Sequence, residues 1–117
     1  STALLRLRAE RAQQEGRSDE AIALCRRVLD IDPLDGRTML VLADLQHRAG
    51  RLEDAAITCE RAARVAGYEA DALVRHARIE VERERYGRAV ELLEASLAFD
   101  DRPHVARYLE QVRRLAD

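Results

Sequence analysis

Apolar residues recur along the chain at every third or fourth position, with charged residues between them. This spacing places the apolar side chains on one face of a helix, and no run alternates apolar and polar residues as a half-buried strand would. Glycine and proline interrupt the pattern about every 15–17 residues and mark the turns. Ser18 is expected to cap the second helix and Pro33 to end it. The pattern predicts seven helices, at 3–15, 18–31, 36–49, 52–66, 69–83, 86–100 and 103–116.

The predicted helices repeat with a period of 34 residues. The segment GRSDEAI at 16–22 returns as GRLEDAA at 50–56 and, more weakly, as ERYGRAV at 84–90. A fixed period of this length is typical of stacked helix pairs, in which neighbouring pairs bury one continuous core. Small residues that would let helix backbones approach recur at Ala9, Ala43 and Ala77 in first helices and at Ala21, Ala55 and Ala89 in second helices. The residues expected to fill the layers between pairs are Leu5, Met39, Leu73, Leu29, Ile31, Val65, Leu97 and Phe99.

The predicted fold is an all-α solenoid of three antiparallel helix pairs, at about 2–35, 36–69 and 70–103, followed by a capping helix at 104–117. The last helix has one apolar stripe and one charged face, as a terminal cap requires. That stripe consists of Val105, Tyr108, Leu109, Val112 and Leu115. In the first helix, Leu4 and Leu7 form a second apolar patch. Either they complete the local core, or they pack against a second copy, or they pack against an upstream repeat, which would make the sequence a fragment.

The composition narrows the class of protein. The 117 residues fit one domain, and 20 basic residues against 22 acidic ones give a net charge of −2. This balance argues against nucleic-acid binding, which favours a basic protein. No apolar run approaches the roughly 20 residues that cross a bilayer, so direct membrane insertion is not expected. Every basic residue is arginine, which we associate with GC-rich bacterial coding.

The two cysteines, Cys25 and Cys59, lie one period apart. Equivalent positions on neighbouring stacked helices are roughly 8–10 Å apart, which exceeds the limit of about 7 Å between the Cα atoms of a disulfide. Both are therefore predicted to be buried free thiols. Free thiols favour a reducing compartment, and we expect a cytoplasmic protein.

Together these features resemble tetratricopeptide repeats, a family of 34-residue helix pairs with small residues at set positions, a glycine at the first turn and a proline after the second helix. The first repeat matches at Ala9, Gly16, Ala21, Leu29 and Pro33. The second matches at Leu42, Ala43, Gly50, Ala55 and Ala62, with Gly67 in place of the proline. The third matches at Leu73, Ala77, Tyr86, Ala89 and Leu97, with Glu84 in place of the glycine and Pro103 two residues late. The resemblance covers nearly the whole chain and implies a right-handed superhelix whose concave groove holds peptides or partner proteins.

The resemblance also implies which residues line that groove. They are Ala3, Arg6, Glu10, Gln13, Arg37, Leu40, Asp44, His47, Asp71, Val74, Arg75, Arg78 and Val81, with Tyr108 at the far end. Arginines that suit carboxylates stand beside apolar residues, so the lining predicts a partner segment that is both acidic and apolar. The alternative is that these charges pair with neighbouring helices, since exposed pairs contribute only about 0–1 kcal/mol and indicate little by themselves.

One variant of the family clamps the acidic C-termini of heat-shock chaperones with lysine, asparagine and arginine side chains. This chain has no lysine and no asparagine. Arg6 and Arg75 fall at two of the clamp positions, but Glu10 and Val41 stand where the amides belong. The departure argues against binding of chaperone tails.

Catalytic and metal-binding motifs are absent from the sequence. The three histidines, His47, His76 and His104, fall on different predicted helices, and neither an H-x-x-x-H nor a C-x-x-C spacing occurs. His76 takes the place of Leu42 one repeat on, so it is expected to be partly buried. The charged run at 80–85 is predicted to be a solvated helix end with ion pairs along the helix rather than a carboxylate site. The sequence thus predicts no enzyme, no metal and no cofactor.

Two functions fit these observations. The first is a protein–protein interaction adaptor or scaffold that binds a peptide or partner helix in the groove. The second is a structural role, in which the stack associates with itself or continues a longer repeat array through Leu4 and Leu7.

Overall fold

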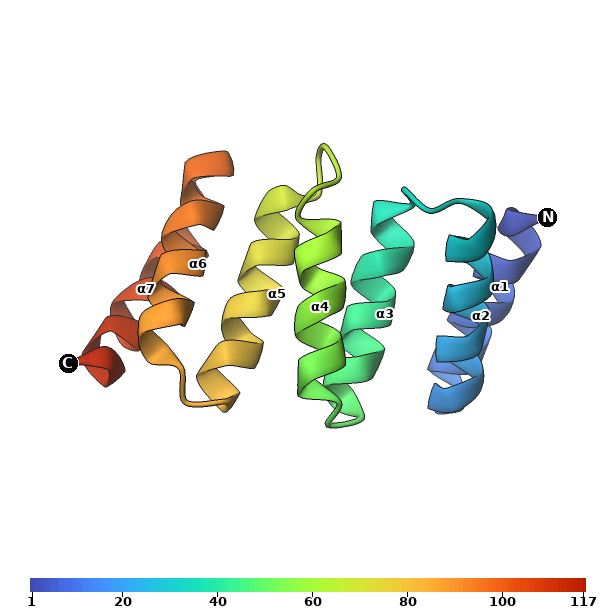
Figure 1. The fold of residues 1–117 in the computed structure, drawn as a ribbon, viewed down its shortest axis with the longest axis horizontal. Coiled ribbons are helices and arrows are strands. Elements are labelled where there is room, and N and C mark those ends of the chain that lie inside the picture. Colours follow the sequence, from blue (N-terminus) through green and yellow to red (C-terminus); the bar gives the residue numbers. More distant parts are fainter.

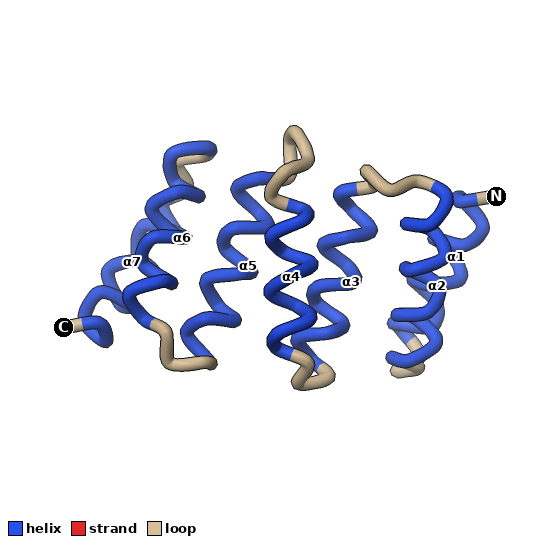
Figure 2. The backbone as a smooth tube through the Cα atoms, viewed as in Figure 1, coloured by secondary structure: helices blue, strands red, loops and turns tan.

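The structure, a computed structural model, describes residues 1–117 and consists of seven helices joined by short loops (Figures 1 and 2). The helices are α1 (Thr2–Gln14), α2 (Ser18–Ile31), α3 (Gly36–Arg48), α4 (Leu52–Ala62), α5 (Glu69–Glu82), α6 (Tyr86–Phe99) and α7 (Pro103–Ala116). None of them is long and apolar enough to cross a membrane. The predicted all-α fold is confirmed.

The helices form a stack of antiparallel pairs, α1–α2, α3–α4 and α5–α6, with α7 against the last pair. The stack measures 47 × 27 × 20 Å, and the two termini lie at its opposite ends (Figure 1). The second helices α2, α4 and α6 face the viewer in Figure 1, while the first helices lie toward the other side, where α3 also contacts α5. The helix-pair solenoid is therefore present, and its right-handed superhelical sense stays a prediction.

Repeated alanines mark the points where helices touch. Ala21, Ala55, Ala77 and Ala89 have no solvent exposure, and Ala9 and Ala43 are buried as well. Leu5, Leu29 and Met39 fill the layers between pairs, as predicted. Two residues assigned to the core by the sequence are not in it, because Ile31 and Phe99 are 61% and 62% exposed. They are the last residues of α2 and α6, so they lie at the edge of the stack, beyond the reach of the next pair.

The repeated Gly-Arg dipeptide closes the first helix of a pair. Gly16 and Gly50 have φ angles of +75° and +78°, and the N–H groups of the next residues bond to the carbonyls of Ala12 and Gln46. This left-handed termination favours glycine. In the third pair Glu84 adopts the same geometry with a φ of 60°, which is uncommon for a residue with a side chain. The geometry of the stack thus requires the turn even where glycine is missing.

Most helix ends fall within one residue of the prediction, but the cap of α2 and the end of α4 differ from it. Ser18 is the first residue of α2 rather than its cap, since Arg17 is in the N-cap position and no side chain caps the helix. Helix α4 ends at Ala62 rather than at residue 66, because the chain tightens into turns with i→i−3 hydrogen bonds at 64 and 65. These turns bring the Tyr68 ring onto Gly36 at the start of α3, where a Cβ atom would overlap the ring. Because α4 ends early, the segment after it places the Tyr68 ring against Gly36, the first residue of α3.

Candidate functional site

The predicted groove residues lie on the first helices α1, α3 and α5, with Tyr108 on α7. We call the surface formed by these four helices the first-helix face. The structure shows which of its charges remain available to a partner and which are already engaged within the chain.

At the N-terminal end of this face, Arg6 is bound to the start of α3. Its Nε atom donates to Asp35 Oδ2 at 2.7 Å, and a nitrogen of its guanidinium lies 3.5 Å from Asp32. Asp35 caps α3 by accepting from the Thr38 N–H at 3.1 Å. Burial alone would raise the pKa of Asp35, but the hydrogen bonds from Thr38 and Arg6 outweigh it and the pKa is lowered. Arg6 therefore fastens α1 to a helix cap.

In the middle of the face, three pairs join consecutive first helices. Arg75 on α5 donates to Asp44 on α3 at 3.0 Å, and His47 Nε2 lies 2.7 Å from Glu82. Arg37 on α3 lies 3.8 Å from Glu10 on α1, with 75% of its side chain exposed. Contacts between basic and acidic side chains thus join each first helix to the next.

At the C-terminal end, α5 is joined to α7 in two ways. Asp71 accepts from Arg102, the N-cap residue of α7, at 2.7 Å. The Arg78 guanidinium lies 5.9 Å from the centre of the Tyr108 ring, within the range of a cation–π contact. Tyr108 is half-buried, and burial raises the pKa of its hydroxyl, so the ring stays neutral at physiological pH. Arg78 is exposed and has no carboxylate within 4 Å.

The apolar groove residues are less accessible than the sequence suggested. Leu40 and Val74 are only 8% and 6% exposed, so their side chains belong mainly to the core, whereas Val81 is half-buried. A cavity of about 30 Å³ lies between α1, α2 and α3, below Arg6, Glu10 and Arg37. Most charges among the predicted groove residues are thus paired within the chain. Arg78 has no carboxylate within 4 Å, and Arg37 is mostly exposed beside Glu10.

A second group of charged residues was not predicted from the sequence. Glu80, assigned to a solvated helix end, is 2% exposed, and this assignment was wrong. Its Oε1 atom lies 3.0 Å from Arg83 and 3.5 Å from His76 Nε2, and its Oε2 atom lies 3.6 Å from Arg85. Glu80 is buried because it stands on the face of α5 that packs under α4 and α6. The available signal was the 34-residue period, since the equivalent residues Gln46 and Ala12 are buried too.

Burial also sets the protonation of nearby groups. His76 is buried as predicted, and burial lowers its pKa despite the nearby Glu80 and Glu60 carboxylates. Cys25 and Cys59 are buried free thiols, and burial raises their pKa to about 11 and about 12. Thiols that stay protonated at neutral pH are weak nucleophiles. No group of three or more His, Cys, Asp or Glu side chains is placed to hold a metal ion.

The comparisons with known proteins agree with this architecture. Residues 12–67 match the family model of the tetratricopeptide repeat. No curated protein sequence matches the chain. Among solved structures, the N-terminal domain of stress-induced protein-1 (STI-1) from C. elegans superposes with a TM-score of 0.88 at 14% identity, over 96% of this chain and 94% of that one.

Two other similar structures contain bound peptides. The first TPR of Spaghetti (RPAP3) bound to the HSP90 peptide SRMEEVD has a TM-score of 0.86 at 19% identity, over 99% of this chain and 94% of that one. The type III secretion chaperone SycD of Yersinia enterocolitica, in complex with a peptide of the translocator YopD, has a TM-score of 0.81 at 17% identity, over 97% and 87%. Residues 12–67 thus match the tetratricopeptide repeat. At these identities the likeness to solved structures shows that the whole chain has the same helix-pair fold.

Proposed function

We propose that this chain is a protein-interaction adaptor that binds a segment of a partner protein on the first-helix face, toward its α5–α7 end. The observation that carries the proposal is Arg78, an exposed cation with no carboxylate partner in the chain, placed over the Tyr108 ring. Of the other predicted groove arginines, Arg6 and Arg75 are engaged within the chain, and Arg37 makes only a contact of 3.8 Å with Glu10. The role is one of binding rather than catalysis, with no nucleic acid and no cofactor involved.

The expected ligand is a short segment with an acidic residue next to an apolar one. A carboxylate would pair with Arg78, while an apolar side chain would contact the Tyr108 ring and Val81 beside it. Arg37, the other exposed arginine among the predicted groove residues, would contact the far end of a longer segment. Because a segment that is disordered before binding loses about 2–5 kcal/mol in ordering, modest affinity is expected.

Clamping of an acidic chaperone tail is not part of the proposal. A similar structure is bound to an HSP90 peptide. By the family resemblance, Arg6 and Arg75 fall at two of the clamp positions. In this chain, however, Arg6 is bound to Asp35 and Arg75 to Asp44. A tail would have to displace both in-chain carboxylates.

Charge reversal of Arg78 tests the proposed site. Arg78→Glu is expected to weaken partner binding at least about tenfold, which is 1.4 kcal/mol, because it replaces attraction with repulsion. Arg27→Glu is the matched control, since Arg27 is an exposed arginine on α2 with no ion pair, outside the first-helix face. Partners captured by the intact chain and by each variant are identified by mass spectrometry, and the dissociation constants of those captured are then measured. If Arg78→Glu binds every partner as tightly as the wild type does, the first-helix face is not the site.

We propose self-association through α1 as the second candidate function. Leu4 and Leu7 are 57% and 63% exposed, and a hollow of about 400 Å³ lies beside them. At the positions where α3 buries Leu42 and Leu45, α1 carries Arg8 and Arg11. A helix that covers this patch must therefore bring carboxylates to the two arginines as well as apolar side chains to the leucines.

Sedimentation over a range of protein concentrations tests this second candidate. The wild-type chain is expected to shift from monomer to dimer as its concentration rises, and Leu4→Glu to remain monomeric, because a buried carboxylate would have to be desolvated at the contact. Ile31→Glu, at an exposed position at the end of α2, serves as the control and should dimerise as the wild type does. A wild-type chain that stays monomeric at the highest concentration would remove the candidate.

A further inference from the structure

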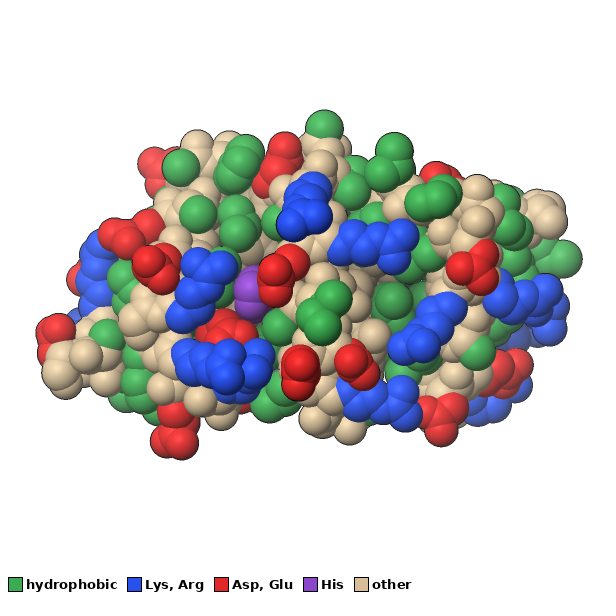
Figure 3. All heavy atoms as spheres, in the orientation of Figure 1, with side chains coloured by type: hydrophobic (Ala, Val, Ile, Leu, Met, Phe, Trp, Pro, Cys, Tyr) green, Lys and Arg blue, Asp and Glu red, His purple; other side chains and the backbone are tan.

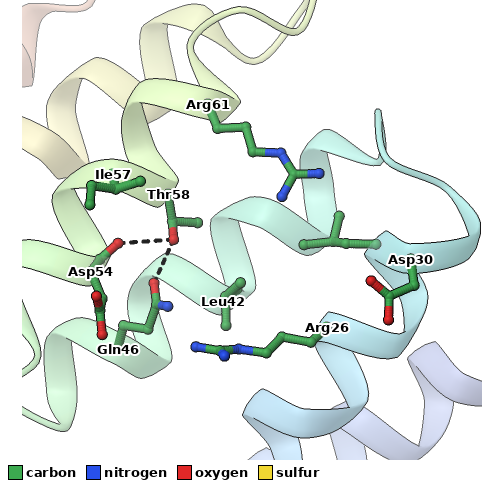
Figure 4. Close-up of a pocket in the computed structure, with 9 residues that line it drawn as sticks. Arg26, Asp30, Leu42, Gln46, Asp54, Ile57, Thr58 and Arg61 are labelled. Carbon is green, nitrogen blue, oxygen red and sulfur yellow. Dashed lines mark hydrogen bonds between the residues drawn. The ribbon is translucent and has the colours of Figure 1, made fainter.

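The largest hollow of the molecule lies on the opposite side from the proposed site, between the second helices α2 and α4 and over α3. It has a volume of about 460 Å³ (Figure 4). Its floor contains the buried side chains of Leu29, Leu42 and Gln46, and its wall includes Ile57, which is 57% exposed. In the space-filling view of this side, basic and acidic groups are interspersed over the surface (Figure 3). The hollow thus has an apolar floor and wall and charged groups at its rim.

Two guanidinium groups enter this hollow from opposite walls, Arg26 from α2 and Arg61 from α4 (Figure 4). Neither has a carboxylate within 4 Å, although Asp30 follows Arg26 by one helical turn and Asp54 also lines the hollow. Arg61 is held in place because it donates to the Pro33 carbonyl at 3.1 Å. Two cations are therefore positioned around an apolar surface without a carboxylate in ion-pair contact.

The next repeat shows what such a hollow can contain. The equivalent hollow between α4 and α6, of about 260 Å³, is lined by His76, Glu80 and Arg88, which replace Leu42, Gln46 and Asp54 one period on. There the Glu80 carboxylate is 2% exposed and lies among arginines, 3.0 Å from Arg83. The chain's own carboxylate occupies the second hollow.

In the hollow between α2 and α4, Gln46 takes the position that Glu80 has in the hollow between α4 and α6. Its amide is neutral and is held by the Thr58 hydroxyl, which lies 2.7 Å from Gln46 Oε1 and 3.0 Å from the Asp54 carbonyl (Figure 4). No carboxylate of the chain therefore forms an ion pair with Arg26 or Arg61, although Asp30 and Asp54 line the same hollow. Charge complementarity indicates that an external carboxylate would take this place.

We propose that this hollow is a second docking site, which binds a partner-protein segment carrying a single glutamate or aspartate between aliphatic residues. The carboxylate lies between Arg26 and Arg61, and the aliphatic side chains cover Leu29, Leu42 and Ile57. Asp30 and Asp54 at the rim repel further acidic residues, so the site prefers one isolated carboxylate to an acidic run. The contact is small, and its affinity for a short peptide is accordingly weak.

Peptide titration of the 117-residue chain, followed by amide NMR shifts, tests this proposal. The probe is the capped pentapeptide acetyl-Arg-Leu-Glu-Leu-Arg-amide. Its controls are the same peptide with glutamine in place of glutamate, the acidic run acetyl-Glu-Leu-Glu-Leu-Glu-amide, and inorganic phosphate. We expect the glutamate peptide to shift resonances around Arg26, Leu42 and Arg61, and each control to bind at least about fivefold more weakly there.

Substitutions then separate this hollow from the rest of the surface. Arg26→Gln and Arg61→Gln, both at exposed positions, should each weaken the glutamate peptide at least about fivefold, while Arg27→Gln should bind it as the wild type does. Gln46→Glu should abolish binding by supplying the in-chain carboxylate that Glu80 supplies one repeat on. Because Gln46 is buried, the exposed variants keep the test valid if this one fails to fold.

Three results would overturn the proposal. Phosphate could produce the same shifts with the same affinity, which would make the hollow a general anion site. Arg26→Gln and Arg61→Gln could bind the peptide as tightly as the wild type does. Shifts confined to α5 and α7 would also contradict it, and they would at the same time support binding at Arg78, so the two proposed sites can fail separately.

Discussion

Arg83→Ala is expected to lower the free energy of unfolding by about 3 kcal/mol at neutral pH, whereas Glu80→Gln should change it by less than about 1 kcal/mol. Removing one partner of a buried ion pair leaves an uncompensated buried charge, which costs about 3–5 kcal/mol. The Glu80 side chain is 3% exposed, and Arg83 makes the short contact with it at 3.0 Å. Because Arg85 and His76 remain within 3.6 Å, we expect the lower end of that range.

Glu80→Gln differs because it removes the buried charge itself. Arg85 is then left with 57% of its side chain in solvent, and Arg83 with 21%, so water can replace much of the lost contact. One oxygen of Glu80, Oε2, has no hydrogen-bond donor, so a neutral amide loses little there. The equivalent residue in the second repeat is already glutamine, at 3% exposure.

A double-mutant cycle measured by urea unfolding decides between the two explanations of the Arg83→Ala effect. If the buried charge is responsible, the double variant with Glu80→Gln should regain most of the stability lost by Arg83→Ala alone. If the double variant is as unstable as Arg83→Ala, the loss comes from the packing of the arginine stem at the end of α5, and the buried charge of Glu80 is not its cause.

Local patterns were sufficient to predict the helices and the pairing of their small residues. The period placed Ala55 and Ala89 at helix contacts, and it located the turns at Gly16 and Gly50. The end of α4 was missed because no glycine or proline stands at 63, where the chain leaves the helix. That turn depends on the contact of Tyr68 with Gly36, which are far apart in sequence, and no local pattern shows it.

The sequence could assign the predicted groove residues to their helices but could not show which of their charges are paired. A sequence shows that Arg6, Arg75 and Asp71 are charged, but it does not show that their partners lie 29 to 31 residues away. Whether an arginine is free or engaged depends on distances of a few tenths of a nanometre between neighbouring pairs. For that reason Arg75 and Arg78 carry equal weight in a prediction from sequence, while only Arg78 has no carboxylate beside it.

Ala55→Leu is expected to destabilise the fold by about 3 kcal/mol through overpacking, at the upper end of the usual range for such changes. Ala55 has no solvent exposure and lies in a cluster with Ala43, Ala56, Cys59 and Ile79. Three additional carbon atoms at this point must separate α4 from α3, because the interior is close-packed and has no space to receive them.

Ala23→Leu is the matched control, since it makes the same change on an exposed surface of the neighbouring second helix. Its equivalent one repeat later is Ile57, which is 57% exposed, so the position already accepts a large apolar side chain in this fold. The control should remain within about 0.5 kcal/mol of the wild type in thermal or urea unfolding. Equal stability of Ala55→Leu and Ala23→Leu would mean that the repeated alanines do not set the distance between helices, and the packing explanation of the 34-residue period would have to be abandoned.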